Sequence, residues 1–347
     1  MSKDKVPLFF HEKYAEYSFG KFHPFKPNRF PRFVEEIKEE KKMSKKVEVK
    51  ESPSIKNDIL ESVHSPGYIN EVHEKEKSGG ALTMDTPVKK GTPEAGKKIV
   101  GGSLQAAKMM EKTDFAINLG GLHHAGPDYG EGFCIFNDVA VAAQYLAQNK
   151  KDVVIFDTDA HQGNGTMDIF WKNPRVLFIS IHQDPTTLYP GRGHVNEIGE
   201  NEGEGYTVNI PMPRDASISE YHYAIEEVVE PVIDDFSPDV VIRNGGSDPH
   251  HADSLTDLAL DMEGLKYLGE KSRKMAHDVD AGYIDLMLSG YGSRVVEGWK
   301  ALTIGSLGVD VPLPEDQKVG DVDYEPKNKV VEDVEKLRDI LGEYWQF

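Results

Sequence analysis

The sequence predicts an α/β fold built around a parallel β-sheet. From residue 95 onward, short runs rich in β-branched residues alternate with segments whose apolar residues recur at helical spacing, which is the pattern of βαβ units. Polar residues and glycines gather directly after the apolar runs, as expected at the carboxyl ends of parallel strands. The 347 residues, 38% of them hydrophobic, suffice for one large domain or two smaller ones.

Five apolar runs are predicted to be buried strands, because their lengths and bounding turns suit strands covered on both faces. They span residues 115–119, 153–156, 176–181, 240–243 and 283–288. Residues 138–148 and 219–235 have the apolar spacing of helices that cover such a sheet. The charge-rich residues 35–52 are interpreted as a solvated helix end followed by a loop.

A last helix is predicted near the C-terminus, at about residues 327–342. Its apolar residues form one stripe. We expect this stripe to dock on the core rather than to bind a partner. The stripe consists of Val330, Val331, Val334, Leu337 and Leu341.

Composition limits the function classes. No stretch approaches the roughly 18 apolar residues of a membrane span, and the N-terminus lacks a signal peptide's apolar region, so a cytoplasmic protein is predicted. The net charge of −19 argues against direct nucleic-acid binding and favours cationic substrates such as lysine-bearing tails or polyamines. With Cys134 as the only cysteine, a metal site would need histidine and carboxylate ligands.

Asp159, His161 and Asp248 are the candidate metal ligands. Asp159 and His161 stand two residues apart just after a predicted strand, so in an extended chain both side chains point to one side. Asp248 follows the strand at 240–243 and is the best-placed third ligand. Three protein ligands leave an open position, as in a catalytic zinc site, although two carboxylates and one imidazole also suit Fe(II) or Mn(II).

An alternative interpretation of this pair is structural. Asp159 would cap a helix, and backbone carbonyls would satisfy His161. The glycines of the following His-Gln-Gly-Asn-Gly segment favour a crowded small site instead. Asp157 sits further back on the strand, where it can orient a catalytic histidine or help to hold a monovalent cation.

His123, His124 and Tyr291 are the candidate catalytic residues. The adjacent histidines follow a strand end, and one of them can take a proton from a metal-activated water while the other stabilises charge. Tyr291 stands between glycines in Ser-Gly-Tyr-Gly, which would let its phenol reach a polarised carbonyl oxygen. Taken singly, each of these residues also allows a structural role: the histidines could be packed or lie at the surface, and the tyrosine could be buried in a turn.

The combined motifs resemble the arginase-fold histone deacetylase family, including its bacterial and archaeal acetoin-utilisation and deacetylase-like members. The resemblance runs from about residue 8 to about residue 312 and includes HPFKPNRF and MDTPV upstream. The matching segments are GGLHHAG at 120–126, EGFCIFNDVAVAA at 131–143, DTDAHQGNGT at 157–166, ISIH at 179–182, LYPGRG at 188–193, GGSD at 245–248 and SGYG at 289–292.

This resemblance implies a fold, a reaction and a set of ions. The chain would be a single domain over residues 1–347, with a largely parallel sheet of about eight strands, a core over about 8–312 and a C-terminal extension. It would hydrolyse the amide of an acetylated amine, most simply acetyl-lysine in protein, with an acetylpolyamine or small acetamide as the alternative. Zn²⁺, with Fe²⁺ as an alternative, would be catalytic, and K⁺ would be structural.

The resemblance also implies residue roles. Asp159, His161 and Asp248 would bind zinc. His124 would be the general base and acid, His123 its electrostatic partner and Tyr291 the carbonyl polariser. Asn164 stands behind the base, where many family members have Asp.

The substrate and potassium sites are implied in the same way. Phe133 and Tyr189 would form the walls of an acyl-lysine channel, with Gly132 accepting the substrate amide. Asp85 would fix the substrate backbone at the rim, and Arg29 would lie near the acetate exit. The potassium site would comprise Asp157, Ser180 and backbone oxygens of Asp159, His161 and Ile181.

Two other functions compete with this prediction. A binuclear manganese ureohydrolase of the same fold would need further carboxylate ligands. The residue after His161 is Gln162, which is not a carboxylate. An inactive binding module would be marked by loss of Tyr291 or of a metal ligand, and none is lost.

Overall fold

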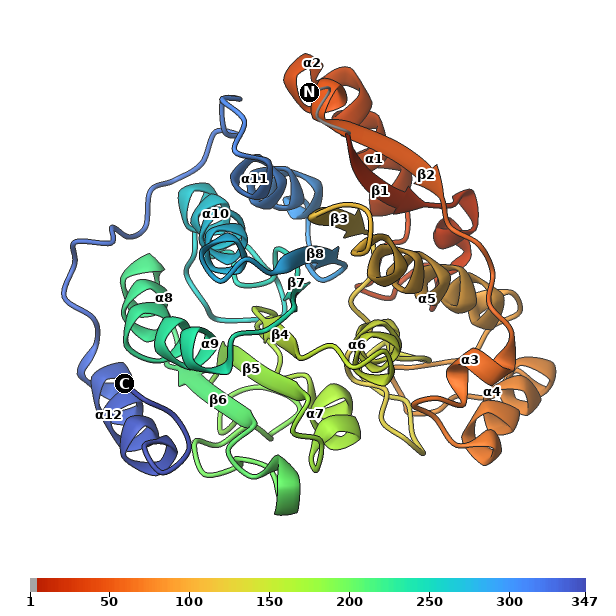
Figure 1. Ribbon diagram of the computed structural model, residues 1–347. Coiled ribbons are helices and arrows are strands. Elements are labelled where there is room, and N and C mark those ends of the chain that lie inside the picture. The colour runs from red at the N-terminus through yellow and green to blue at the C-terminus, as the bar shows by residue number, and fades with distance from the viewer. Residues whose placement is uncertain (1–4) are drawn as a thin grey trace. The chain divides into compact units, whose positions relative to one another are not determined.

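The computed structural model describes residues 5–347. Eight strands form one sheet in the order β2-β1-β3-β8-β7-β4-β5-β6, flanked by helices (Figure 1). The predicted α/β class with a largely parallel sheet of about eight strands is therefore confirmed. The strands are β1 Val6–Phe10, β2 Val47–Glu51, β3 Phe115–Asn118, β4 Val153–Asp157, β5 Val176–Gln183, β6 Thr207–Met212, β7 Val240–Gly245 and β8 Gly282–Met287.

The helix predicted at residues 219–235 is interrupted. A π-helical turn, Ile225–Val229, separates α8 from α9. The turn ends two residues before Pro231, which has no backbone N–H to continue the hydrogen-bond ladder. The α-helices are α1 Arg29–Glu39, α2 Lys41–Lys46, α3 Asn57–Leu60, α4 Pro66–Ser78, α5 Thr92–Met109, α6 Asp138–Gln148, α7 Asn164–Phe170, α8 Ile218–Ala224, α9 Glu230–Phe236, α10 Met262–Asp278, α11 Val295–Leu307 and α12 Asn328–Leu341.

The chain divides into two compact units. The first contains the chain up to Lys150 together with residues 163–169 and 284–288. In this unit α5 packs on β1, β3 and α6. A Cβ added at Gly102 of α5 would lie 2.3 Å from Asn118 Oδ1, so only glycine lets the helix lie this close to β3.

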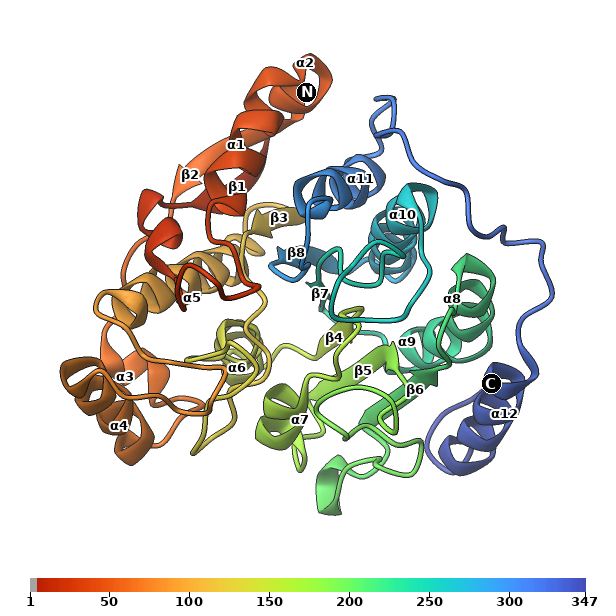
Figure 2. The ribbon, with the colours of Figure 1, turned by 180° about the vertical axis from the view of Figure 1, so that it is seen from behind.

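The second unit contains residues 151–162, 170–283 and 289–347. Its strand β4 pairs in parallel with both β5 and β7, with Val153 opposite Val176 on one side and Val240 on the other. Helix α10 packs on α11 and on β7, and α12 lies along β6 and α8 (Figure 2). Four residues of the C-terminal stripe are buried, so the predicted docking of this helix is confirmed, whereas Val331 is only half-buried. The buried four are Val330, Val334, Leu337 and Leu341.

The interpretation of residues 35–52 as a helix end and a loop was wrong. This stretch contains the end of α1, all of α2 and the strand β2. β2 is an edge strand whose only buried residue is Val47, and its charged residues face water. Such a strand lacks the continuous apolar run that identified the others, because edge strands are commonly charged.

Strands β1 and β6 also lie outside the five predicted runs. β6 occupies the far edge of the sheet, where Pro211 is tolerated because an edge strand leaves one row of N–H groups unpaired. β6 is buried at every residue, as are β3, β4, β5 and β7. Asn209 and Pro211 interrupt its apolar run, whereas each of the other four begins with at least three consecutive apolar residues, which identified them from sequence. Within residues 5–347, no helix has both the length and the apolar character needed to cross a membrane.

Candidate functional site

In the second unit, two neighbouring strands end beside the predicted metal ligands. β4 and β7 pair in parallel, with Asp157 opposite Asn244 near their carboxyl ends. The loops that follow these strands therefore leave from the same edge of the sheet. One loop carries Asp159 and His161, and the other carries Asp248.

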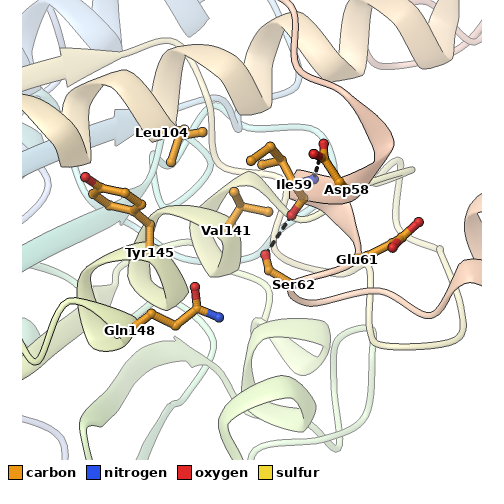
Figure 3. A pocket seen from close by; sticks show the side chains of 8 residues that line it. All are labelled: Asp58, Ile59, Glu61, Ser62, Leu104, Val141, Tyr145 and Gln148. Atoms are coloured by element: carbon orange, nitrogen blue, oxygen red, sulfur yellow. Dashed lines mark hydrogen bonds between the residues drawn. The ribbon is translucent and has the colours of Figure 1, made fainter.

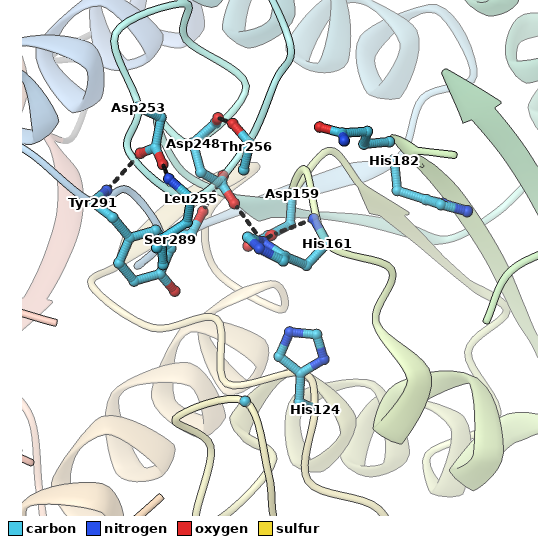
Figure 4. Close-up of polar contacts among 12 residues, drawn as sticks. His124, Asp159, His161, His182, Asp248, Asp253, Leu255, Thr256, Ser289 and Tyr291 are labelled. Atoms are coloured by element: carbon cyan, nitrogen blue, oxygen red, sulfur yellow. Dashed lines mark hydrogen bonds and ion pairs between the residues drawn. The ribbon is translucent and has the colours of Figure 1, made fainter. Parts of the chain in front are cut away.

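The side chains of Asp159, His161 and Asp248 converge at one buried point (Figure 4). His161 Nδ1 lies 3.2 Å from Asp159 Oδ1 and 3.1 Å from Asp248 Oδ2. One ligand atom from each residue lies within 4.8 Å of the other two. A single ion can therefore contact all three residues.

Hydrogen bonds aim the two carboxylates at this point. Asp159 Oδ1 accepts the backbone N–H of His161 at 2.9 Å. Asp248 Oδ1 accepts the hydroxyl of Ser289 at 2.6 Å, which leaves Oδ2 facing the imidazole. A Cβ at Gly246 would lie 2.2 Å from the Ser289 carbonyl oxygen, so glycine is required for the approach of these two loops.

The electrostatics of the cluster fit a cation. Burial raises the pKa of Asp248 well above its ordinary value, and the charge of Asp159 raises it further, against the opposing effect of His161. Burial disfavours charge on His161, but its hydrogen bonds to both carboxylates outweigh this and raise its pKa to about 10. Two buried carboxylates this close together are stabilised by a proton on one of them or by a positive charge between them. A divalent ion would supply that charge, and the donor set suits zinc as well as Fe(II) or Mn(II).

Tyr291 is buried in the same unit, in the loop after β8. Its ring meets the His161 ring edge-on, with centroids 6.2 Å apart. The backbone N–H of Tyr291 donates to Asp253 Oδ2 at 2.6 Å (Figure 4). The Ser254 hydroxyl donates to the Tyr291 carbonyl at 2.7 Å. Both main-chain polar groups of the tyrosine are thus held by one neighbouring loop.

Asp157 and Ser180, predicted to bind potassium, lie opposite each other on β4 and β5. Asp157 Oδ1 accepts hydrogen bonds from Asn244 Nδ2 and from the backbone N–H of Asp159, each at 3.1 Å. This buried carboxylate therefore links the ends of β4 and β7 and supports the turn that carries the first metal ligand.

His182 determines the direction of the Ser180 hydroxyl. Nε2 of His182 lies 2.9 Å from the Gly193 carbonyl oxygen, so it carries the proton, and Nδ1 accepts the Ser180 hydroxyl at 2.8 Å. Burial lowers the pKa of His182 to about 4, so the ring is neutral at pH 7. Because the Ser180 proton points to His182, the oxygen lone pairs face elsewhere, as a cation ligand requires. Ile181 follows Ser180 in the same strand.

In the first unit, His123 and His124 lie buried in the loop after β3, with ring centroids 4.1 Å apart. His124 Nδ1 lies 2.7 Å from Asn164 Oδ1. The amide Nδ2 of Asn164 donates to Glu131 Oε1 at 2.7 Å and to the Tyr129 hydroxyl at 3.2 Å. Because a carboxylate only accepts, this contact orients the amide and makes Asn164 Oδ1 the acceptor of a proton on His124 Nδ1.

Asn137 supports the loop that carries both histidines. Its Nδ2 donates to the Ala125 carbonyl at 2.9 Å and to Thr166 Oγ1 at 3.0 Å, and the Thr166 backbone N–H donates to the His123 carbonyl at 2.9 Å. The Asn137 side-chain oxygen also caps α6 by accepting from the Ala140 N–H. One amide thus connects the histidine loop to two helices.

His64 supports the same loop from the other side. Its Nδ1 lies 2.7 Å from the Gly126 carbonyl oxygen, and its Nε2 accepts the backbone N–H of Asn137 at 3.0 Å. The ring is therefore neutral with its proton on Nδ1. Burial lowers the pKa of His64 to about 4, which agrees with this arrangement.

Gly132 lies against His124, and Phe133 follows Gly132. Both have positive φ, of 54° and 66°, and a Cβ on Gly132 would lie 2.5 Å from His124 Cδ2. The Phe133 N–H donates to Thr86 Oγ1 at 3.0 Å, and its carbonyl accepts the Tyr17 hydroxyl at 2.8 Å. The strained backbone is thus fixed on both sides of the phenylalanine.

The remaining predicted substrate residues are Asp85, Arg29 and Tyr189. Asp85 is exposed and lies in the loop before α5, two residues after Thr83. Arg29 is buried, with Nη1 donating to the Leu288 carbonyl at 3.0 Å and its guanidinium over the Phe25 ring. Tyr189, in the second unit, is 40% exposed between β5 and β6.

A second histidine–carboxylate group, formed by His250, His251 and Asp316, also has ligand spacing. His250 Nδ1 accepts the Ala252 N–H at 3.1 Å, so the ring proton is on Nε2, which lies 2.8 Å from Asp316 Oδ2. A metal bound at His250 Nε2 would require the ring proton on Nδ1, and that proton would then face the N–H of Ala252. This group is therefore a hydrogen-bonded link between two loops.

A surface hollow of about 330 Å³ lies in the first unit among α3, α5 and α6 (Figure 3). Apolar side chains such as Leu104 and Val141 form its floor, and the carboxylates Asp58 and Glu61 stand at its rim. Its lining contains no imidazole and no pair of groups suited to nucleophilic attack. The hollow is not the predicted catalytic site.

Comparison with known proteins identifies the family. Residues 23–304 match the model of the histone deacetylase domain. This chain belongs to the histone deacetylase family. A probable deacetylase of Archaeoglobus fulgidus is 35% identical over 309 residues, covering 87% of this chain and 84% of the relative. The acetoin utilization protein AcuC of Bacillus subtilis is 36% identical over 271 residues, covering 72% and 69%.

The fold comparison agrees. The crystal structure of the HDA15 HD domain has a TM-score of 0.86 and 27% sequence identity to this chain, and the match covers 99% of this chain and 97% of that one. The predicted family is confirmed, and the chain is a deacetylase of the histone deacetylase family. The buried Asp159 cluster is consistent with a metal site of this family.

Sequence reasoning missed several residues that hold the candidate site residues of each unit in place. They act through hydrogen bonds made only in the folded chain, so no spacing pattern indicates them. Asp138 had one available signal, since it begins a predicted helix. Its Oδ1 accepts the N–H groups of Gly121 and Leu122 just ahead of the histidine pair. The missed residues are His64, Glu131, Asn137, Asp138, Asp253 and Ser289.

Proposed function

We propose that this protein is a zinc-dependent deacetylase that hydrolyses the amide of acetyl-lysine in proteins and releases acetate. The observation that carries the proposal is the buried cluster of two carboxylates and one imidazole nitrogen within 4.8 Å of one another. Family membership supports the reaction class. The donor set supports zinc, with Fe²⁺ as the alternative.

Zinc bound by Asp159, His161 and Asp248 would lower the pKa of water to about 7 and polarise the acyl carbonyl. His124 removes the proton from the attacking water. Because its Nδ1–H donates to Asn164, the lone pair is on Nε2, and Nε2 can accept that proton. The same nitrogen then protonates the leaving amine of lysine.

His123 and Tyr291 stabilise charge in this scheme. His123 lies beside His124 and acts as its electrostatic partner. Tyr291 donates its phenol hydrogen to the acyl oxygen as negative charge develops there, a contribution of about 3 kcal/mol for one such donor. Asp253 and Ser254 hold the Tyr291 backbone in place for this role.

Phe133 and Tyr189 form the walls that hold the acyl-lysine stem, and the Gly132 carbonyl accepts its amide. The positive φ of Gly132 and its close approach to His124 support this placement. Asp85 fixes the substrate backbone, and Arg29 lies near the acetate exit. A structural potassium ion is held by Asp157, Ser180 and backbone oxygens that include that of Ile181. A cytoplasmic location stays a prediction.

The test is acetate release by the metal-loaded protein. Acetyl-lysine peptides, free acetyl-lysine and acetylpolyamines are assayed with and without added zinc. We expect zinc-dependent release from the peptides. Faster release from acetylpolyamines would favour the small-amine alternative, and no release from any acylated amine would refute the enzymatic proposal.

A further inference from the structure

Two loops of the first unit meet beside the proposed acyl-lysine channel. His23 Nε2 lies 3.0 Å from the Asp85 carbonyl oxygen, which joins residues 20–25 to residues 82–88. The His23 ring packs edge-on against the Phe133 ring, with centroids 4.4 Å apart. Phe133 in turn follows Gly132, whose backbone contacts His124. A continuous series of contacts therefore leads from the proposed base to these loops.

Each loop exposes a large apolar side chain next to that hydrogen bond. Phe22 precedes His23 and is 94% exposed, and Met84 precedes Asp85 and is fully exposed at 103%. Most side chains of this size are partly buried in a monomer, and exposed apolar groups beside a site are common binding contacts. Phe22 and Met84 therefore offer an apolar contact to whatever flanks the channel.

The same loops carry positive charge in an otherwise acidic protein. Lys21 lies next to Phe22, with its Nζ 5.8 Å from the ring centroid. Lys26 Nζ donates to the Lys21 carbonyl at 2.8 Å, and a Cβ on Gly20 would lie 2.6 Å from Lys89 Nζ. All three lysines are exposed, so the charge near the channel is locally opposite to the net charge of −19.

Asp85 supplies the remaining feature of this surface. Its Oδ1 accepts the hydroxyls of Thr83 and Thr86, which fixes the carboxylate. Oδ2 makes no hydrogen bond or ion pair to another residue within 5–347 and is exposed with its side chain. A fixed, exposed carboxylate oxygen suits the backbone N–H groups of an extended polypeptide.

We propose that this entrance patch, made of Lys21, Phe22, Lys26, Met84 and Lys89, selects acyl-lysines in polypeptides that have apolar and acidic neighbours. The proposal rests on the proposed deacetylase function and names its substrate class. A flanking apolar residue packs on Phe22 and Met84, and a flanking carboxylate pairs with the lysines. Polyamines and lysine-rich tails are disfavoured, because like charges repel at the entrance.

Competition among matched substrates tests the proposal. Three peptides of equal length carry one Nε-acetyl-lysine flanked by Leu and Glu, by two Ser, or by Lys and Arg, and N-acetylspermidine is the fourth probe. We expect kcat/KM to be about tenfold higher for the Leu–Glu peptide than for the Ser peptide, since burying part of one leucine side chain accounts for such a factor. The Lys–Arg peptide and the polyamine should be slowest.

Substitutions assign this preference to the patch. Phe22→Ser and Met84→Ser should each lower the Leu–Glu to Ser ratio severalfold, and Lys26→Glu with Lys89→Glu should raise the Lys–Arg rate relative to the Leu–Glu rate. Tyr324→Ser, at another exposed aromatic residue, should leave every ratio unchanged. Equal rates for all flanks, or ratios unaffected by the patch substitutions, would refute the proposal while leaving the deacetylase function intact. Absence of acetate release from all four probes would refute both.

Discussion

Acid pH should destabilise this protein through His64. In the folded chain both ring nitrogens of His64 are committed, one donating to Gly126 and the other accepting from Asn137. Protonation would place a second N–H against the Asn137 N–H, so the charged form loses a hydrogen bond as well as its hydration. This is why burial lowers the pKa of His64 from 6.5 to about 4.

The sign and size of the effect follow from this shift. Below pH 6.5 the unfolded chain binds a proton at His64, whereas the folded chain does so only near pH 4. The free energy of unfolding is therefore undiminished by His64 above pH 6.5 and falls as the pH is lowered toward 4. At about 1.4 kcal/mol for each pKa unit, the loss attributable to His64 between pH 7.5 and pH 5.0 is about 2 kcal/mol. His182, whose pKa is also lowered to about 4, adds a similar loss in the second unit.

The assay is urea unfolding at pH 7.5 and pH 5.0. His64→Gln keeps an acceptor for the Asn137 N–H but cannot titrate, so its stability loss between the two pH values should be about 2 kcal/mol smaller than that of the parent. His277→Gln, at a side chain that is 79% exposed, should behave like the parent. A His64→Gln variant with the parent's full acid sensitivity would refute the neutral, buried state of His64.

Three further substitutions test the proposed chemistry. Tyr291→Phe should lower kcat about 100- to 1,000-fold with little change in KM, because the lost donor acts only in the transition state. Asp248→Asn should abolish zinc binding measured by elemental analysis, together with acetate release. Asn164→Leu should lower kcat about tenfold or more at unchanged zinc content, because the proton on His124 Nδ1 loses its acceptor. A chelator should stop turnover, and added zinc should restore it.

Matched controls separate these effects from misfolding. Asp316→Asn removes a carboxylate from the second histidine group, which is a hydrogen-bonded link, so its zinc content should equal that of the parent. If Asp316→Asn also lost zinc, the assignment of that group as structural would be wrong. A Tyr291→Phe rate equal to that of the parent would exclude the phenol from the reaction, and an Asn164→Leu rate near that of the parent would exclude the proposed control of the His124 tautomer.

The sequence predicted that the two candidate ligands after β4 act together, although their spacing alone also allowed a structural role. Asp159 and His161 are two residues apart after a wholly buried strand, which is why the sequence paired them. The chain does not stay extended there: it bends at Ala160 and His161, and the His161 N–H donates to Asp159 Oδ1. Asp248 is 87 residues from His161. It was predictable because parallel strands align their carboxyl ends, and β4 and β7 were recognisable from their apolar runs.

Only the tertiary structure decided which groups orient His124 and the loop that carries it. The amide direction of Asn164 depends on Glu131, and the tautomer of His64 depends on Gly126 and Asn137. These contacts join segments that are 33 to 73 residues apart in the chain. Their roles therefore left no periodic or spacing signal.

The entrance patch shows most clearly the difference between what the sequence determines and what the folded chain decides. The sequence by itself determined a net charge of −19, which predicts attraction of cationic substrates. The folded chain instead brings Lys26 and Lys89 together around His23 and leaves Phe22 and Met84 exposed. Net charge is a sum over all residues, whereas a substrate meets the few that folding gathers at one place, because electrostatic interactions in salt decay within about 10 Å.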